Sequence, residues 1–114
     1  MEIGVLKAAL ASANGVILTR HAQIEALAEQ LNLKEVRASI IANGEIIEDY
    51  PNDPRGMSCL ILSSLLDGRP VHSCWGYQPL LHTAVLITVY RPDLQPLKWM
   101  LDWRRRSNPR NTTS

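Results

Sequence analysis

The spacing of apolar residues changes from a helical to a strand pattern near the middle of this chain, and this change limits the folds open to it. Up to Asn43-Gly44, apolar residues recur at helical intervals in three segments, 2–12, 19–31 and 33–43. Beyond it they alternate or form β-branched runs over 45–50, 59–66, 69–75 and 84–90, before a last helical pattern at 97–104. Helices followed by strands predict an α+β fold. We expect N-terminal helices packed on a four-stranded, mainly antiparallel sheet, with a short C-terminal helix.

Two residues fit the start of predicted helices. Thr19 precedes one apolar face, and Asn32 precedes the next with Glu35 three positions later, as in a capping box. The short apolar run 16–18 lies directly before Thr19. It is either a brief strand or the entry into the helix.

A turn signal predicts how two strands pair. Asp67-Gly68 separates 59–66 from 69–75 and is typical of a two-residue hairpin. Such a turn would place Ile61 opposite Cys74 and Ser63 opposite His72. His72 would then share a sheet face with Cys59 and Ile61.

Length and composition exclude several classes of protein. A chain of 114 residues, 46% of them hydrophobic, predicts one globular domain over residues 1–106, followed by a flexible tail at 107–114. No segment approaches the roughly 20 apolar residues of a membrane span, so we expect a cytoplasmic protein. With two cysteines, no C-x-x-C or H-E-x-x-H and no Gly-rich phosphate loop, the sequence predicts no metal and no cofactor.

His21 and His72 are the candidate proton carriers, because histidine most easily gives or takes a proton near neutral pH. His21 would lie in the first turn of a helix, where the positive dipole end favours the neutral base. It could equally be a first-turn residue packed against the sheet. His72 would lie in a strand, either within the core or lining a groove. We predict that the two open onto one groove.

Other candidate site residues lie on later strands. Glu48 could orient a histidine, or it could face solvent on an alternating strand. Tyr90 and Arg91 end a strand, where both could reach a phosphate. Tyr90 could instead be an ordinary residue of the sheet rim.

The C-terminal end is basic. Residues 91–114 contain six basic and two acidic residues, a net charge of +4. Trp103 and the run Arg104-Arg105-Arg106 combine an aromatic face with guanidinium groups, which can stack on bases and bind phosphates. The same residues also describe a terminal helix docked through tryptophan, with arginines in solvent.

Several segments together resemble a widespread bacterial family of unknown function (a DUF family). They are L-T-R-H-A, N-G-E-I-I-E-D-Y-P, S-C-L-I-L, G-R-P-V-H, I-T-V-Y-R-P-D and a tryptophan followed by arginines, spread over about residues 15–106. Members are similar in fold to the RelE/ParE and BrnT toxins and are typically paired with a zinc-finger antitoxin of the YgiT type. The resemblance implies the toxin of a type II toxin–antitoxin system.

Toxins of this fold commonly act as metal-independent endoribonucleases (mRNA interferases). The resemblance therefore implies RNA or the ribosome as a partner, besides the antitoxin. In this reading His21, His72, Glu48 and Tyr90 are catalytic, and Arg20, Arg91, Trp103 and Arg104–Arg106 bind RNA. RelE-like nucleases carry several Lys or Arg on the sheet, whereas this sequence has no Lys between Lys34 and Lys98. The alternative is a non-catalytic protein-interaction module on the same fold. The sequence leaves the oligomeric state open.

Overall fold

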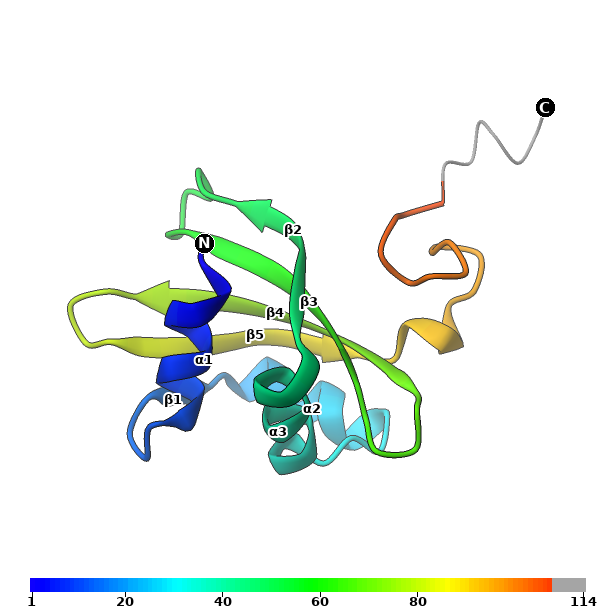
Figure 1. Cartoon of the computed structure of the whole chain (residues 1–114), viewed down its shortest axis with the longest axis horizontal. Coiled ribbons are helices and arrows are strands. Elements are labelled where there is room, and N and C mark those ends of the chain that lie inside the picture. The colour runs from blue at the N-terminus through cyan, green and yellow to red at the C-terminus, as the bar shows by residue number, and fades with distance from the viewer. Residues whose placement is uncertain (108–114) are drawn as a thin grey trace.

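The computed structural model describes residues 1–107 as three helices on one side of a five-stranded sheet (Figure 1). The elements follow in this order: α1 Ile3–Ala11, β1 Val16–Leu18, α2 Arg20–Ala28, α3 Leu33–Asn43, β2 Glu45–Tyr50, β3 Ser58–Ser64, β4 Pro70–Gln78, β5 Thr83–Tyr90 and the 3-10 turn η1 Pro92–Leu94. The α+β class predicted from the sequence is confirmed. Apart from Ser107, the predicted flexible tail lies outside the described residues.

The sheet has one more strand than predicted, and it is mixed. Its strand order is β1-β5-β4-β3-β2, with β1 parallel to β5 and the other neighbours antiparallel. The short run 16–18 is thus an edge strand rather than an entry into α2. Three residues give too short a periodic signal to reveal a strand whose partner lies about 68 positions later, as Val16 does opposite Ala84.

One face of the sheet forms the core with the helices. The buried helix-facing residues of the strands are Cys59, Ile61, Val71, Trp75, Ala84, Leu86 and Val89. Leu6 and Leu10 of α1 and Val36 and Ile40 of α3 pack against them. Since strand side chains alternate between faces, His72, Gly76 and Val85 lie on the face turned away from the helices.

The β3–β4 hairpin differs from the predicted one by one residue. The Leu65 N–H donates to Arg69 O at 2.9 Å and the Gly68 N–H to Leu65 O at 2.9 Å, which makes a three-residue loop with Gly68 at φ 85°. The predicted register is therefore wrong: Leu62, not Ser63, lies opposite His72. A slip of one residue exchanges the faces, so His72 does not share a face with Ile61.

Gly68 is expected to stabilise this loop measurably. Its positive φ carries little penalty for glycine but about 1–2 kcal/mol for a residue with a Cβ. Gly68→Ala should lower the free energy of unfolding by about 1 kcal/mol in urea titrations. Gly4→Ala is the control, because a Cβ there meets nothing within 4 Å and its φ is not positive. An equal loss in both variants would contradict this account.

The predicted C-terminal helix is wrong. After η1 the chain doubles back instead: Met100 N–H donates to Arg105 O at 2.8 Å and Ser107 N–H to Lys98 O at 2.9 Å, with Trp99 bridged to Arg106. We call residues 95–107 the C-terminal strap. The helical spacing of 97–104 forms no helix here, because the chain folds back through turns, with Trp103 at φ 61°. This return buries the Trp99 side chain against His72, gives the His72 imidazole the Trp103 carbonyl as an acceptor, and places Arg104 and Arg106 opposite Glu45 and Glu48.

Within residues 1–107, every helix is too short or too polar to cross a membrane.

Candidate functional site

Residues from three strands and the strap converge at one end of the sheet. Glu48 comes from β2, His72 from β4, Tyr90 from β5, and Trp99 and Arg106 from the strap. His72 and Tyr90 are direct cross-strand partners. We call these five residues the His72 cluster. It contains two of the predicted catalytic residues in hydrogen-bond contact, together with a third, Glu48.

His72 is fully buried, and both ring nitrogens are engaged. Nε2 lies 2.7 Å from the carbonyl oxygen of Trp103, and Nδ1 lies 3.1 Å from the Tyr90 hydroxyl. Because a carbonyl oxygen accepts and does not donate, Nε2 carries the hydrogen, and Nδ1 accepts one from Tyr90. Burial lowers the pKa of His72 and raises the pKa of Tyr90 to about 12. Both groups are therefore neutral at neutral pH.

Trp99 forms the cover over His72. Its ring centroid lies 4.2 Å from that of His72 at an interplanar angle of 76°, and its side chain is 3% exposed. The Arg106 guanidinium lies 4.8 Å from the Trp99 ring centroid. The strap thus closes this end of the sheet with an aromatic ring that contacts both an imidazole and a cation.

Ion pairs fasten the strap to β2. Arg106 donates to both Glu48 oxygens, at 2.8 and 3.0 Å, and Tyr50 also donates to Glu48. The paired Arg106 guanidinium holds the pKa of the Glu48 carboxyl below its usual range. Arg104 pairs with Glu45 in the same way. Two arginines predicted to bind RNA are therefore neutralised by strand carboxylates, while Arg105 is largely exposed, 3.9 Å from Asp102.

The sequence did not indicate the roles of Tyr50 and Trp99. Tyr50 lies two residues after Glu48 in the predicted strand 45–50, and nothing in the sequence marks it as a donor to Glu48. Trp99 was expected in a helix, and the carbonyl of Trp103, rather than its ring, reaches His72. No local pattern could have shown either role, because residues 101–105 form turns and bends rather than a regular element, and Trp103 has a φ of 61°.

His21 lies apart from this cluster. Its Nε2 is 3.1 Å from Glu25 Oε1, and its side chain is 71% exposed. Glu25 also accepts from the Val89 N–H and the Thr88 hydroxyl, so it covers the edge of β5 beyond the end of β1. Within residues 1–107, no hydrogen bond or ring contact joins His21 to His72, and the two lie at different parts of the sheet. The structure does not bring the two predicted proton carriers onto one groove.

The other predicted phosphate ligands are placed separately. Arg91 is 9% exposed, and its guanidinium donates to Glu29 O at 2.9 Å and Gln30 O at 3.0 Å, at the end of α2. In this position Arg91 caps a helix. Arg20 is exposed at the start of α2, beside His21. In the part of the chain that is described, no group of three His, Cys, Asp or Glu residues is placed to hold a metal ion.

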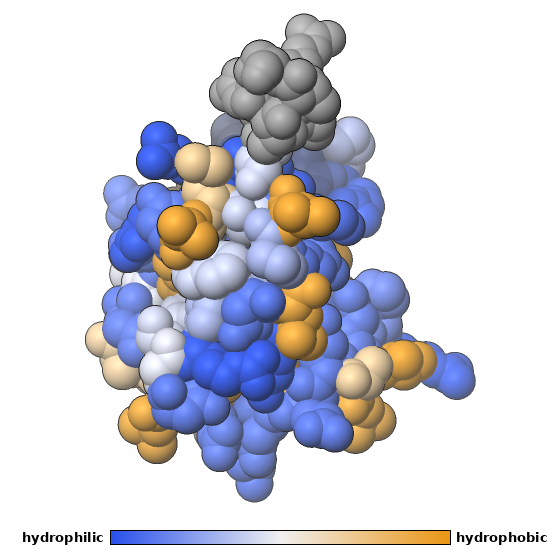
Figure 2. Space-filling model, turned by 90° about the vertical axis from the view of Figure 1, so that its right-hand side faces the viewer, coloured by the Kyte–Doolittle hydropathy of each residue, from blue (hydrophilic) through white to orange (hydrophobic). Residues whose placement is uncertain are grey.

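The outer surface of the strap is mixed in polarity. Leu97 and Leu101 are more than nine-tenths exposed, and Met100 is partly exposed, as is Leu94 of the preceding η1 turn. Figure 2 views the molecule from the end that carries the strap and shows separate hydrophobic patches on a mostly hydrophilic surface. The strap therefore turns its polar backbone and Trp99 inward and several aliphatic side chains outward.

The buried neutral state of His72 predicts a pH dependence of stability. Its pKa is lower in the folded than in the unfolded chain, so the unfolded state binds more protons as pH falls through about 6.5. The contribution of His72 to the free energy of unfolding should have its full value above that pH and decline below it.

The measurement is the free energy of unfolding in urea at pH 7.5 and 5.5, for wild type and His72→Gln. We expect a larger loss in wild type. The comparison cancels Glu29, whose pKa is raised by burial and which contributes in the opposite direction. Equal losses in the two proteins would show that His72 is not the titrating group.

One comparison with known proteins gave a match. The model of a domain of unknown function, DUF4258, matches residues 18–91. This segment contains Glu48, His72 and Tyr90, and ends before the strap. Neither a curated protein nor a solved structure matches the chain.

Proposed function

The chain belongs to the DUF4258 family, and on this basis we propose that it is the toxin of a type II toxin–antitoxin pair, a metal-independent endoribonuclease acting through the His72 cluster. The observation that carries the proposal is the convergence of a neutral histidine, a protonated tyrosine, a carboxylate and a guanidinium from four segments of the chain. These are the groups that proton transfer at a phosphodiester requires.

In this mechanism His72 moves one proton from the 2′-hydroxyl to the 5′-oxygen. Once Trp103 O leaves, the ring hydrogen resides on Nδ1, which donates to the Tyr90 hydroxyl oxygen, and Nε2 is free to take the 2′ proton and then give it to the 5′-oxygen. The ribose 2′-oxygen attacks the adjacent phosphorus as its proton is removed, and the bond to the 5′-oxygen breaks as that oxygen gains a proton. The products are a 2′,3′-cyclic phosphate and a 5′-hydroxyl. Tyr90 fixes the orientation of the imidazole through Nδ1, and the nearby negative charge of Glu48 favours the protonated ring. Arg106 supplies positive charge to the phosphate.

RNA reaches His72 when the strap moves. In the closed arrangement Trp99 covers the ring and Trp103 O occupies Nε2. A phosphate group can replace Glu48 as the partner of Arg106, since both are anions that bind a guanidinium with two hydrogen bonds. The exchange would free Glu48 and keep Arg106 paired. The proposed partners are a zinc-finger antitoxin of the YgiT type and cytoplasmic mRNA or the ribosome.

The test is incubation of purified protein with single-stranded RNA in the presence of EDTA. Cleavage that leaves 5′-hydroxyl and cyclic-phosphate ends, together with growth arrest on expression, supports the proposal. Intact RNA under these conditions and with added ribosomes would contradict it. His72→Gln, purified in parallel, controls for contaminating nuclease.

A second candidate is a non-catalytic interaction module. The observation that favours it is the closed state of the cluster, in which both nitrogens of His72 are satisfied and Arg104 and Arg106 are paired. On this reading the cluster is a buried polar network that fixes the strap. Growth arrest that survives His72→Gln would favour this candidate over the nuclease.

A further inference from the structure

The face that bears His72 continues beyond the strap into an open groove. His72, Cys74 and Gly76 point to the same face of β4, because strand side chains alternate. Four residues of strand span about 13 Å. At Gly76 the strap no longer covers the sheet, and a hollow of about 220 Å³ opens there.

Gly76 and a strand irregularity shape the floor. Gly76 has no side chain, and its cross-strand partner is Val85. The β4–β5 register shifts between Cys74 and Trp75, and Ile87, which has no Cα partner on β4, lies two residues after Val85 and also lines the hollow. A Cβ built on Gly76 would lie 3.5 Å from Ile87 Cδ1 and 4.0 Å from Val85 Cβ. The floor is therefore apolar and open because position 76 is glycine.

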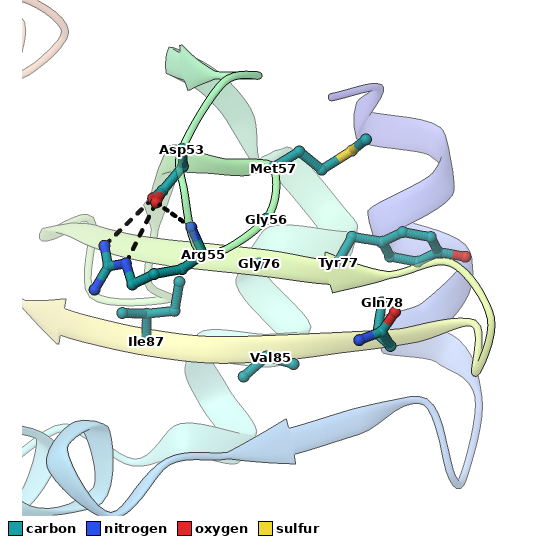
Figure 3. A pocket seen from close by; sticks show the side chains of 9 residues that line it. All are labelled: Asp53, Arg55, Gly56, Met57, Gly76, Tyr77, Gln78, Val85 and Ile87. Atoms are coloured by element: carbon teal, nitrogen blue, oxygen red, sulfur yellow. Dashed lines mark hydrogen bonds and ion pairs between the residues drawn. The ribbon is translucent and has the colours of Figure 1, made fainter.

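The wall carries one acidic and one basic side chain. Asp53 and Arg55 lie on the β2–β3 loop, which stands over β4 in Figure 3, while Val85 and Ile87 project from β5 below it. Arg55 donates to both Asp53 oxygens at 3.3 Å, and its side chain is 79% exposed. These are the only charged residues among the nine that line the groove, and their charges cancel.

We propose that this groove binds one nucleobase of single-stranded RNA, next to the phosphate held at the His72 cluster. The inference deepens the proposed function and rests on it. An apolar floor beside an exposed guanidinium suits a planar ring, which stacks on such surfaces. A wall of zero net charge suits a neutral base better than a phosphate. Asp53, whose oxygens accept from Arg55 and Ser58, fixes the Arg55 guanidinium, whose remaining N–H groups can donate to the edge of a base.

The size of the hollow agrees with one ring system. Sites that enclose whole drug-sized ligands measure about 300–1,000 Å³. A hollow of about 220 Å³ holds a smaller group. Its distance from His72, about 13 Å along β4, leaves room for the sugar–phosphate chain to pass between the two places.

The test uses tetranucleotides whose 2′-oxygens are methylated, so that they bind without being cleaved. A base on the floor should shift the Ile87 Cδ1 methyl signal in NMR spectra through its ring current. Gly76→Ile fills the hollow and should weaken binding at least tenfold, with a smaller effect for Gly76→Ala. A Cβ at position 76 meets only ordinary contacts, so Gly76→Ala is expected to fold, and its smaller loss of binding shows the effect without the larger side chain. Gly4→Ile is the control at a glycine that does not line the groove.

The outcomes distinguish failure of the base-binding proposal from failure of the nuclease proposal. An unshifted Ile87 methyl signal, or unchanged RNA binding by Gly76→Ile, overturns the proposal that the groove binds a base. So does a shift with N-acetyl-leucinamide but not with the tetranucleotides, which would indicate a site for a peptide side chain. If wild-type protein binds the tetranucleotides, Gly76→Ile weakens that binding, and wild-type protein still does not cleave RNA, the nuclease proposal is overturned and the base site is supported.

Discussion

Replacing His72 with glutamine is expected to lower RNA cleavage by about 10²–10⁴-fold, the usual contribution of one positioned acid or base. Glutamine cannot transfer a proton at neutral pH. Its amide nitrogen can still donate to Trp103 O, and its amide oxygen can accept from Tyr90, as the imidazole does now. The variant should therefore remain folded, and the loss should appear in the rate of cleavage rather than in RNA binding.

His21→Gln is the matched control for this variant. His21 is exposed and interacts with Glu25 at the edge of β5, away from the His72 cluster. Its replacement is expected to change cleavage less than about twofold, well under the loss for His72. If His21→Gln abolished cleavage while His72→Gln did not, the site would lie at the start of α2 beside Arg20, and the cluster would be structural.

Local signals predicted most helices and strands correctly. Asn32 was identified as a cap, and its side chain accepts from the N–H groups of Lys34 and Glu35 at the start of α3. The strand 45–50 was predicted with the bounds that β2 has. Cap chemistry and residue periodicity act within a few positions, so one sequence contains the information.

Longer-range features could not be predicted in the same way. The register of β3 and β4 depended on whether the loop at Gly68 has two or three residues, and this one residue decided which face His72 occupies. The strap depended on residues far earlier in the chain, as in the packing of Trp99 on His72 and the pair of Arg106 with Glu48, 58 positions before it. Spacing within 97–104 does not record such partners, and so it suggested a helix.

The same reasoning applies to the candidate site. Glu48, His72 and Tyr90 were identified from residue type and strand position, and the structure brings them to one end of the sheet. The relation of His21 to His72 was predicted from chemistry alone. The two histidines do not lie together, because His72 faces away from the helices and His21 begins a helix at the sheet edge.

Trp99→Ala is expected to release the strap. Trp99 is 3% exposed and packs on His72, and removing a buried tryptophan side chain costs about 3–5 kcal/mol. The strap is held to the sheet by Trp99, by His72 and by two partly exposed ion pairs, which contribute little. The loss should therefore appear first as local opening and only in part as global unfolding.

Hydrogen exchange distinguishes these two forms of the loss. The amides of Met100 and Ser107 close the strap, so their exchange should accelerate by about 100-fold in Trp99→Ala, while amides of β3 and β4 change less. His72, fully buried in wild type, should then react with diethylpyrocarbonate. Leu101→Ala is the control on the same strap, because that side chain is 92% exposed and its loss should cost less than about 0.5 kcal/mol.

The result bears directly on the nuclease mechanism. If RNA must displace Trp99 to reach His72, a released strap removes that cost, and Trp99→Ala should cleave faster than wild type at low RNA concentration. Strap and core amides that accelerate together would mean that the strap unfolds only with the whole domain. In that case Trp99 is part of the core, His72 stays covered in the folded protein, and the interaction-module reading is the one that the structure favours.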